Sequence, residues 1–335
     1  MKNYHRFSAA FLFVIMFLCI FPSLHYAAGV SVSSSSWKFV VLGDSRGVNK
    51  GINAEVIGKL IPAIIKEHPD FVLFTGDLIS GGIDRRTMSA ELINWRSQVM
   101  EPLLSRGIKV YPVRSSHELL DTDTTQSSSL WNAIFSGAYA LPANGPAEEK
   151  DMTYSFVSHN AFFVALDLYR SGLRHQVNLP WLESQLAGNT RPFIFVFAHE
   201  PAYDAAGMTA QKDGLSIEPV QRDRFVKDVI NAGGEVYFCG NDHWYDHARV
   251  AVEPGKWFHQ FTVGTAGAPL RAWAGTYREK SVLKVAHAEK YGYMVVEIND
   301  SSATLTMKAL EQSGIFTDID SFTYKIKESE LKINK

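Results

Sequence analysis

Five short apolar segments, each ending abruptly in polar residues, constrain the fold of this chain more than any other feature. Continuous apolar runs of this length are typical of strands buried on both faces of a sheet. Because segments with helical spacing separate several of them, the pattern predicts a layered α/β fold. The five segments are Trp37 to Leu42, Phe71 to Thr75, Val110 to Val113, Phe193 to Ala198 and Glu235 to Cys239.

The remaining segments divide into helix-like and strand-like stretches. Apolar residues at helical spacing predict four helices, the first of them kinked or restarted at Pro62: Asn53 to Ile65, Met88 to Leu104, Pro180 to Leu186 and Val220 to Ile230. The later chain is richer in strand patterns, which predicts a second sheet packed on the first. These strands are Thr153 to Val157, Ala161 to Leu166, Trp257 to Val263, Tyr293 to Ile298 and Thr304 to Lys308.

The first 28 residues resemble a secretory signal peptide. Lys2 and Arg6 precede an apolar run from Ala9 to Phe21, and a site of small residues follows at Ala27-Ala28-Gly29. The run is shorter than the roughly 20 residues that cross a bilayer, although an uncleaved anchor is the alternative. We therefore expect a secreted or periplasmic protein that has no membrane contact once residues 1–28 are removed. A serine-rich lead would follow at 29–36.

Composition excludes several classes of protein. The chain has 33 Lys plus Arg against 35 Asp plus Glu, which argues against nucleic-acid binding through bulk charge. With 46% hydrophobic residues and no repeat it should form one large domain at 37–310, followed by a C-terminal strand or tail at 311–335. Its two cysteines, Cys19 and Cys239, exclude a disulfide scaffold. We expect Cys239 to be buried at a strand end, and the sequence leaves the oligomeric state open.

Residues able to bind a metal stand where the predicted strands end. Asp44, Asp77, His199 and His243 each follow an apolar segment. In layered α/β folds, ligands bind beyond the carboxyl ends of the strands, so these side chains should meet on one rim. Mixed oxygen and nitrogen donors suit zinc, manganese or iron. The sequence therefore predicts a site for a divalent metal.

The order of these clusters resembles the calcineurin-like metallophosphoesterase superfamily over about Lys38 to Val263. The resemblance implies a four-layer α/β/β/α sandwich of two mixed sheets flanked by helices. It also implies a phosphatase or phosphodiesterase that acts on a small phosphorylated substrate, with one or two divalent metals as cofactors. The clusters are Gly43-Asp44, Gly76-Asp77, His117-Glu118, Ala198-His199-Glu200-Pro201 and Gly240-Asn241-Asp242-His243.

The resemblance also assigns roles to residues. The superfamily positions for the first metal match Asp44, Arg46, Asp77 and His243, and those for the second match Asp77, Ser116, His199 and Asn241. The histidine that protonates the leaving oxygen matches His117.

Three of these positions depart from the superfamily pattern. Arg46 stands in place of a histidine, Ser116 in place of an asparagine and Asn241 in place of a histidine. A guanidinium does not lose its proton and cannot bind a metal, so the first site keeps three good ligands and the second keeps two. We expect one metal to bind more tightly than the other. Arg46 would either clamp a phosphate oxygen or form an ion pair with a carboxylate such as Asp44.

Three functions are compatible with this pattern. The first is a metal-dependent phosphoester hydrolase in which His117 is the general acid. The second is a catalytically silent protein of the same fold that binds a phosphorylated ligand or another protein. The third is a mononuclear hydrolase of another ester, with its metal on Asp44, Asp77 and His243. The sequence does not distinguish monoesters, diesters and nucleotides as substrates.

Overall fold

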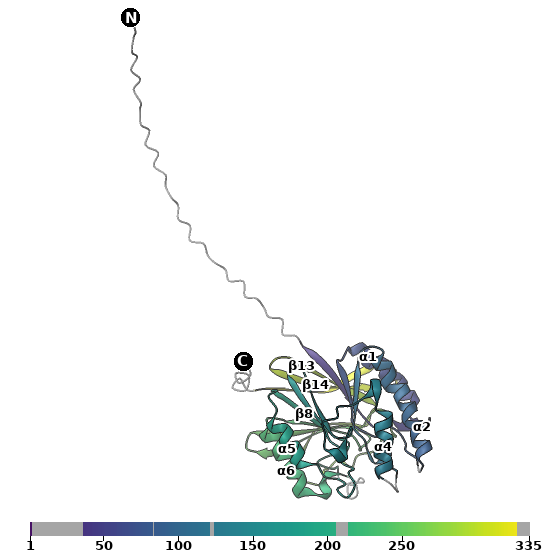
Figure 1. The fold of residues 1–335 in the computed structure, drawn as a ribbon. Helices are drawn as coiled ribbons and strands as arrows, with labels where there is room; N and C mark the ends of the chain where they lie inside the picture. Colours follow the sequence, from purple (N-terminus) through teal and green to yellow (C-terminus); the bar gives the residue numbers. More distant parts are fainter. Residues whose placement is uncertain (2–35, 83, 121–123, 206–213, 327–335) are drawn as a thin grey trace. The chain divides into compact units, whose positions relative to one another are not determined.

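The first sheet carries the two aspartates of the predicted site. The computed structural model describes residues 1, 36–82, 84–120, 124–205 and 214–326, and every helix and strand belongs to the compact unit Ser35–Lys335. Six strands form this sheet in the order β15-β14-β13-β1-β4-β5, and β1, β4 and β5 are parallel. Figure 1 labels β13 and β14 of this sheet. Their bounds are β1 (Trp37–Leu42), β4 (Phe71–Phe74), β5 (Lys109–Pro112), β13 (Gly292–Ile298), β14 (Ser302–Leu310) and β15 (Phe316–Lys325).

The second sheet has seven strands in the order β12-β10-β11-β9-β8-β7-β6. Its members are β6 (Tyr154–Ser158), β7 (Ala161–Ala165), β8 (Phe193–Phe197), β9 (Val236–Cys239), β10 (Tyr245–Glu253), β11 (Lys256–Val263) and β12 (Val282–Ala288). The strands β7, β8, β9 and β11 run parallel, whereas β6 and β10 are antiparallel to their neighbours. A small hairpin pairs β2 (Arg46–Gly47) with β3 (Gly51–Ile52).

Aromatic side chains fill the space between the two sheets. The ring of Phe39 on β1 lies 5.1 Å from that of Phe163 on β7 and 5.2 Å from that of Phe195 on β8, in edge-to-face geometry. Because successive side chains of a strand point to opposite faces, the residues that alternate with Phe195 face away from the first sheet. Ile194 and Val196 accordingly belong to a separate apolar cluster with the helices outside the second sheet.

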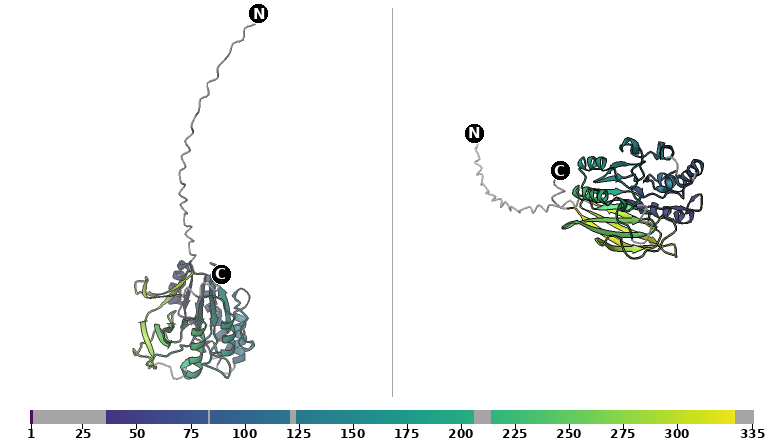
Figure 2. Two further views of the ribbon diagram at one scale, coloured as in Figure 1. Left: turned by 90° about the vertical axis from the view of Figure 1, so that its left-hand side faces the viewer. Right: turned by 90° about the horizontal axis from the view of Figure 1, so that it is seen from below.

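The helices lie outside the strands, with α1 and α2 on one side and α5 and α6 on the other (Figures 1 and 2). Among the described residues the α-helices are α1 (Ala54–Glu67), α2 (Arg85–Trp95), α3 (Glu101–Leu104), α4 (Thr124–Ile134), α5 (Leu179–Ala187) and α6 (Pro219–Asn231). The buried residues of α1 recur at helical spacing, and Asn53 caps its first turn by accepting a hydrogen bond from the Val56 N–H. The predicted fold of two mixed sheets flanked by helices is therefore confirmed.

Several elements differ from those expected. Pro62 does not interrupt α1, which continues to Glu67. The single helix expected from Met88 to Leu104 contains a π-helical turn at Arg96–Met100 between α2 and α3. The strands β10 and β12 lie outside the predicted elements, and much of β12 is exposed, without a continuous apolar run. The C-terminal strand or tail expected at 311–335 is the strand β15.

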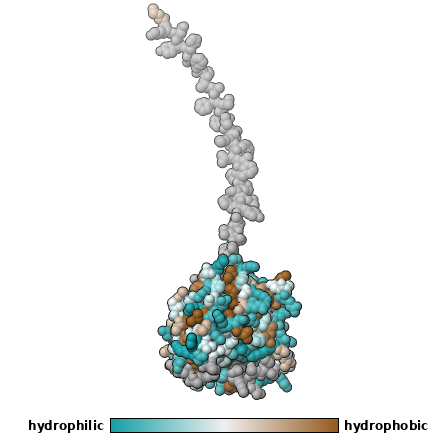
Figure 3. Space-filling view, turned by 90° about the vertical axis from the view of Figure 1, so that its right-hand side faces the viewer, coloured by the Kyte–Doolittle hydropathy of each residue, from teal (hydrophilic) through white to brown (hydrophobic). Residues whose placement is uncertain are grey.

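The surface mixes polar and apolar residues. On the face seen in Figure 3, hydrophobic residues are interspersed among hydrophilic ones. None of the described helices has both the length and the apolar character needed to cross a bilayer. The predicted signal peptide at 1–28 and the lead at 29–36 lie outside the described residues, apart from residues 1 and 36.

Candidate metal centre

Two aspartates follow neighbouring strands of the first sheet. Because β1 and β4 are parallel, with Leu42 paired to Phe74, Asp44 and Asp77 leave the sheet at the same edge. The backbone N–H of Asp44 donates to the carbonyl of Gly76 at 2.9 Å, which fixes one turn against the other. The Asp44 side chain is fully buried and Asp77 is only 3% exposed. The fold thus holds two buried carboxylates side by side.

The glycines of these turns allow the close approach of neighbouring groups. A Cβ atom on Gly43 would lie 2.0 Å from Oγ1 of Thr75, and a Cβ atom on Gly240 would lie 2.2 Å from Oδ2 of Asp44. Both distances are far below van der Waals contact, so no larger residue fits at either position without displacing its neighbours. The Gly-Asp pattern at Asp44 therefore reflects packing at the junction of the two sheets.

The second sheet brings its own polar residues to the same place. His199 follows β8 and Asn241 follows β9, and the backbone N–H of Gly240 donates to the carbonyl of His199 at 2.8 Å. The N–H of Asn241 donates to Oδ1 of Asp44 at 3.0 Å, which joins the two sheets at their carboxyl ends. His243 lies two residues further on, before β10. The structure therefore confirms that the strand-end residues of both sheets meet on one rim.

Three of these strand-end residues adopt left-handed backbone conformations. The φ angles are 61° at Asp44, 50° at Asp77 and 67° at Asn241. Residues other than glycine rarely occupy this region, although aspartate and asparagine tolerate it best. Such conformations persist where the surroundings hold them, and they concentrate at functional sites.

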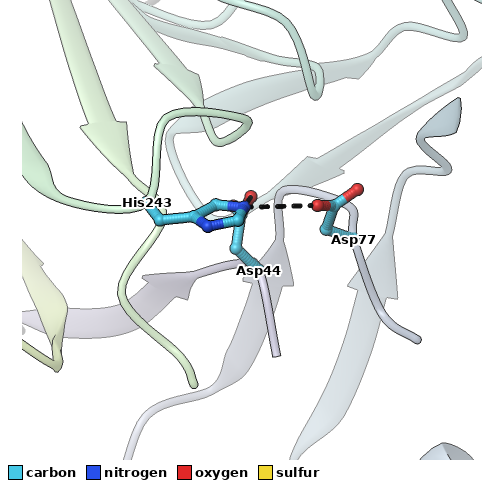
Figure 4. A group of neighbouring side chains, drawn as sticks. All are labelled: Asp44, Asp77 and His243. Atoms are coloured by element: carbon cyan, nitrogen blue, oxygen red, sulfur yellow. Dashed lines mark ion pairs between the residues drawn. The ribbon is translucent and has the colours of Figure 1, made fainter. Parts of the chain in front are cut away.

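Asp44, Asp77 and His243 form a group with the geometry of a metal site. One ligand atom from each lies within 4.8 Å of the others, and all three residues are buried (Figure 4). Nε2 of His243 is 3.7 Å from Oδ1 of Asp44 and 3.6 Å from Oδ2 of Asp77. Nδ1 of His243 lies 2.9 Å from the carbonyl of Pro269, and donation by this nitrogen leaves the lone pair of Nε2 directed at the carboxylates.

Three buried acceptor atoms at this rim have no hydrogen-bond partner among the described residues. They are Oδ2 of Asp44, Oδ1 of Asp77 and Nε2 of His199. Nδ1 of His199 lies 2.8 Å from the carbonyl of Thr75, so its proton is engaged there and Nε2 faces Oδ1 of Asp77 at 3.3 Å with a lone pair. Unpaired buried acceptors are costly, and a cation among them removes that cost. The donor set therefore fits a divalent metal.

Arg46 already supplies one positive charge to this group. Its Nε lies 3.0 Å from Oδ2 of Asp77 and 3.4 Å from Nε2 of His243. The carboxylate that pairs with Arg46 is therefore Asp77, whereas Asp44 is the example expected from the sequence. The reason is local, since Arg46 stands in the β2–β3 hairpin, which directs its side chain across the rim. The Arg46 side chain remains 23% exposed.

The environment shifts the pKa values of all three members of the group. Burial, reinforced by the charge of Asp77, raises the pKa of Asp44 well above its usual range. Burial also acts to raise the pKa of Asp77, but His199, His243 and His117 outweigh it and hold that pKa below its usual value. Burial lowers the pKa of His243, which favours the neutral imidazole that a metal needs.

The predicted general acid lies at the edge of the group. His117 is on a short 3₁₀ helix (Ser116–Glu118), with Nδ1 2.7 Å from the carbonyl of Ser80 and Nε2 3.9 Å from Oδ2 of Asp77. Its side chain is 30% exposed, so Nε2 faces both the rim and the solvent. The fold brings His117 into the cluster, in agreement with the sequence pattern.

The serine beside Asp77 is Ser115 rather than Ser116. Ser116 is exposed, whereas Ser115 is fully buried and its side chain helps to lower the pKa of Asp77. Glu118 fixes this loop, because its carboxylate accepts hydrogen bonds from the N–H groups of Ser115, Leu78 and Ile79. Ser116 matches the superfamily's asparagine by its position before His117, but the capping geometry of the 3₁₀ turn reverses which serine points inward.

Two further arginines lie near the rim. Arg114, adjacent to Ser115, forms a buried bidentate ion pair with Asp167, at 2.8 and 2.7 Å. Arg271, in the segment between β11 and β12, donates its backbone N–H to the carbonyl of His243 at 3.3 Å. No sequence pattern points to Arg271, because no strand or helix signal directly precedes it.

Solved structures of distant proteins share this fold. A purple acid phosphatase, PPD1, from yellow lupin (Lupinus luteus) seeds matches with a TM-score of 0.68 and 17% identity, covering 89% of this chain and 55% of its own. PhoD matches with a TM-score of 0.63 and 14% identity over 88% of this chain and 70% of its own. GAP50, the anchor in the inner membrane complex of Plasmodium, matches with a TM-score of 0.60 and 15% identity, over 89% and 92%. This chain thus spans about half the length of the lupin enzyme.

Sequence comparison places the chain more narrowly. No curated protein sequence matches it. The calcineurin-like phosphoesterase family matches residues 38–245, which include every residue of the cluster around Asp77 described above except Pro269 and Arg271. The chain therefore belongs to the calcineurin-like phosphoesterase family.

Proposed function

We propose that this protein is a metal-dependent phosphoester hydrolase that binds one divalent metal through Asp44, Asp77 and His243. The observation that carries the proposal is the set of buried acceptors at the rim that lack a hydrogen-bond partner among the described residues. Manganese, iron and zinc all suit this mixture of carboxylate and imidazole ligands. A second metal would have Asp77 and His199, with Asn241 as a weak amide donor, and would bind less tightly.

When bound, a divalent metal supplies a Lewis acid for the phosphoryl oxygen and lowers the pKa of a coordinated water. The chain's own residues do the rest. The carbonyls of Pro269 and Thr75 orient His243 and His199, which presents their Nε2 atoms to the centre. His199, His243 and His117, with a smaller contribution from Ser115, lower the pKa of Asp77 and so favour the ionised form that a ligand requires.

His117 acts as the general acid in this proposal. Its Nδ1–H bond to the carbonyl of Ser80 holds the ring so that Nε2 faces the rim. In the imidazolium form, Nε2 gives its proton to the leaving oxygen as the bond to phosphorus breaks, and the ring becomes neutral. Arg46 stabilises the negative charge on the phosphoryl oxygens with the N–H groups that Asp77 and His243 do not engage.

The proposed substrate is a small phosphorylated molecule, and the proposed place of action is the cell exterior or the periplasm. The location is supported by the sequence alone, through Lys2, Arg6 and the apolar run from Ala9 to Phe21. Loss of residues 1–28 from the exported protein, read by intact mass, tests it.

Metal content per chain tests the proposed centre directly. The protein is purified without chelators or a histidine tag and measured by elemental mass spectrometry. We expect about one metal per chain, and none in Asp77→Asn or His243→Gln. Asp318→Asn, which removes an exposed carboxylate on β15, is the matched control and should keep the metal.

Turnover of p-nitrophenyl phosphate tests the chemistry. His117→Gln should keep the metal and lose about 10²-fold or more in kcat. Wild-type protein that takes up no metal after incubation with manganese, zinc and iron would contradict the proposal.

A catalytically silent binding protein is the second candidate. The observation that favours it is the Arg46 guanidinium, which already pairs with Asp77 at 3.0 Å and contacts His243. GAP50, which shares the fold, is described as an anchor. If this candidate is correct, metal uptake and turnover are both absent in the wild type.

A further inference from the structure

Hydrogen bonds of its backbone hold the segment after β11 against the turn that carries Asp44 and against His243. The N–H of Ala266 donates to the carbonyl of Gly43 at 2.8 Å, and the N–H of Ala268 donates to the carbonyl of Asp44 at 2.7 Å. The carbonyl of Pro269 holds Nδ1 of His243 at 2.9 Å. The segment that presents Arg271 is therefore fixed relative to the ligands before any substrate arrives.

Arg271 itself contacts the loop that carries Asn241 and His243. Its backbone N–H donates to the carbonyl of His243 at 3.3 Å, and Nη1 donates to the carbonyl of Asn241 at 3.4 Å. The side chain is half-buried. No carboxylate lies within ion-pair distance of Arg271 among the described residues, although Asp242 is close enough for the guanidinium to oppose the rise in its pKa. A half-buried guanidinium in this state has donors available for an anion.

Arg46 and Arg271 both contact His243. Arg46 reaches Nε2 of His243 with Nε and Nη2, both at 3.4 Å, whereas Arg271 is anchored to its main chain. Within the described residues, Nη1 of Arg46 and Nε and Nη2 of Arg271 make no hydrogen bond. Free donors are therefore available on Arg46, beside the His243 ring, and on Arg271, beside the Asn241 carbonyl.

We propose that Arg46 and Arg271 form an anion site beside His243 that selects the dianionic phosphate group of monoesters over the monoanionic group of diesters. Arginine pairs strongly with phosphate because its planar N–H groups match two oxygens at once. A monoester offers three unsubstituted oxygens and two negative charges to the free N–H groups of both arginines, whereas a diester carries one charge and loses one oxygen to its second substituent. The proposal rests on the proposed function for the position of the phosphate, and it names the substrate class.

The direct test is calorimetric titration of the full protein with inorganic phosphate in the presence of Mn²⁺. Arg271→Met should weaken phosphate binding by about tenfold or more, and Arg271→Lys should recover part of the loss. Arg278→Met is the matched control, because Arg278 lies on the same segment between β11 and β12. The thermal unfolding of each variant shows that the fold is kept. Equal phosphate affinity in Arg271→Met and the wild type would overturn the anion site.

Turnover provides the second readout. For Arg271→Met, kcat/KM for p-nitrophenyl phosphate should fall about tenfold more than kcat/KM for bis(p-nitrophenyl) phosphate. An equal fall for both esters would overturn the selectivity. Wild-type protein that binds phosphate through Arg271 but hydrolyses neither ester would contradict the proposed hydrolase and support the anion site. The two failures are therefore distinguishable.

Discussion

Nε of Arg46 lies 3.0 Å from Oδ2 of Asp77, so a permanent cation pairs with the carboxylate at the middle of the proposed metal site. The same guanidinium lies 3.4 Å from Nε2 of His243. A metal bound to these atoms would meet a like charge at short range. The ion pair and the metal therefore compete for the same ligands.

Removal of this charge should strengthen metal binding. In Arg46→Met we expect the affinity for Mn²⁺ to rise by about tenfold, because repulsion between like charges at a partly exposed site costs on the order of 1 kcal/mol or more. Isothermal titration of metal-free protein measures it. Arg191→Met, an exposed arginine before β8, is the control. A lower affinity in Arg46→Met would show that Arg46 supports the metal site instead of competing with it.

The buried ion pair between Arg114 and Asp167 should be sensitive to loss of either partner. Asp167→Asn should lower the free energy of unfolding by about 3 kcal/mol, because Arg114 would keep a buried charge without its bidentate partner. Urea denaturation measures the change. Arg114→Met combined with Asp167→Leu should cost less than Asp167→Asn alone. A double variant less stable than the single one would mean that the pair itself stabilises the fold.

Asp320 on β15 should matter more to stability than its exposed neighbour. It accepts hydrogen bonds from the Tyr245 hydroxyl at 2.6 Å and from Nδ1 of His247 at 3.1 Å. Asp320→Ala leaves two buried donors unpaired, so we expect a loss of about 2 to 3 kcal/mol in urea denaturation. Asp318→Ala, which removes an exposed carboxylate, should change stability by less than about 0.5 kcal/mol. Similar losses in both variants would contradict this assignment.

His259 should make the fold weaker in acid. Burial and the neighbouring charges of His247 and Arg249 lower the pKa of His259 to about 3. The unfolded chain takes up this proton near pH 6.5, so between about 6.5 and 3 it binds more protons than the folded chain, and stability falls as the pH falls. His259→Gln should flatten the pH dependence of urea denaturation between about pH 6.5 and 4.5. His159→Gln, an exposed histidine, should leave it unchanged, and parallel profiles for all three proteins would refute the assignment.

Much of the fold could be predicted because buried strands leave continuous apolar runs. The strand expected from Trp37 to Leu42 matches β1 at both ends, and the one expected from Glu235 to Cys239 matches β9 to within one residue. The strands β12 and β15 escape this signal, because a strand with one solvated face alternates or lacks apolar residues. Pro62 predicts a break, yet a helix tolerates the loss of one hydrogen bond when its apolar face is buried.

The sequence predicts a site residue correctly only where the residue's position at the end of a strand determines its place in the fold. Asp44 and Asp77 follow parallel neighbours, so their meeting follows from the sheet. Side-chain direction in a tight turn is set by capping bonds, which is why Ser115 and not Ser116 approaches Asp77. No local sequence pattern predicts that Arg271 lies at the site. Main-chain hydrogen bonds between segments that are far apart in the sequence determine its position.

The contact between Tyr245 and Asp320 also sets an order of events during synthesis. Asp44 and Asp77 leave the ribosome early, but the residues that follow His243 gain their partner only when β15 has been made. A chain released before Phe316 would contain every proposed metal ligand and lack the strand that anchors Tyr245. The strand that follows His243 therefore gains this buried partner late in synthesis, because contacts between distant segments form late.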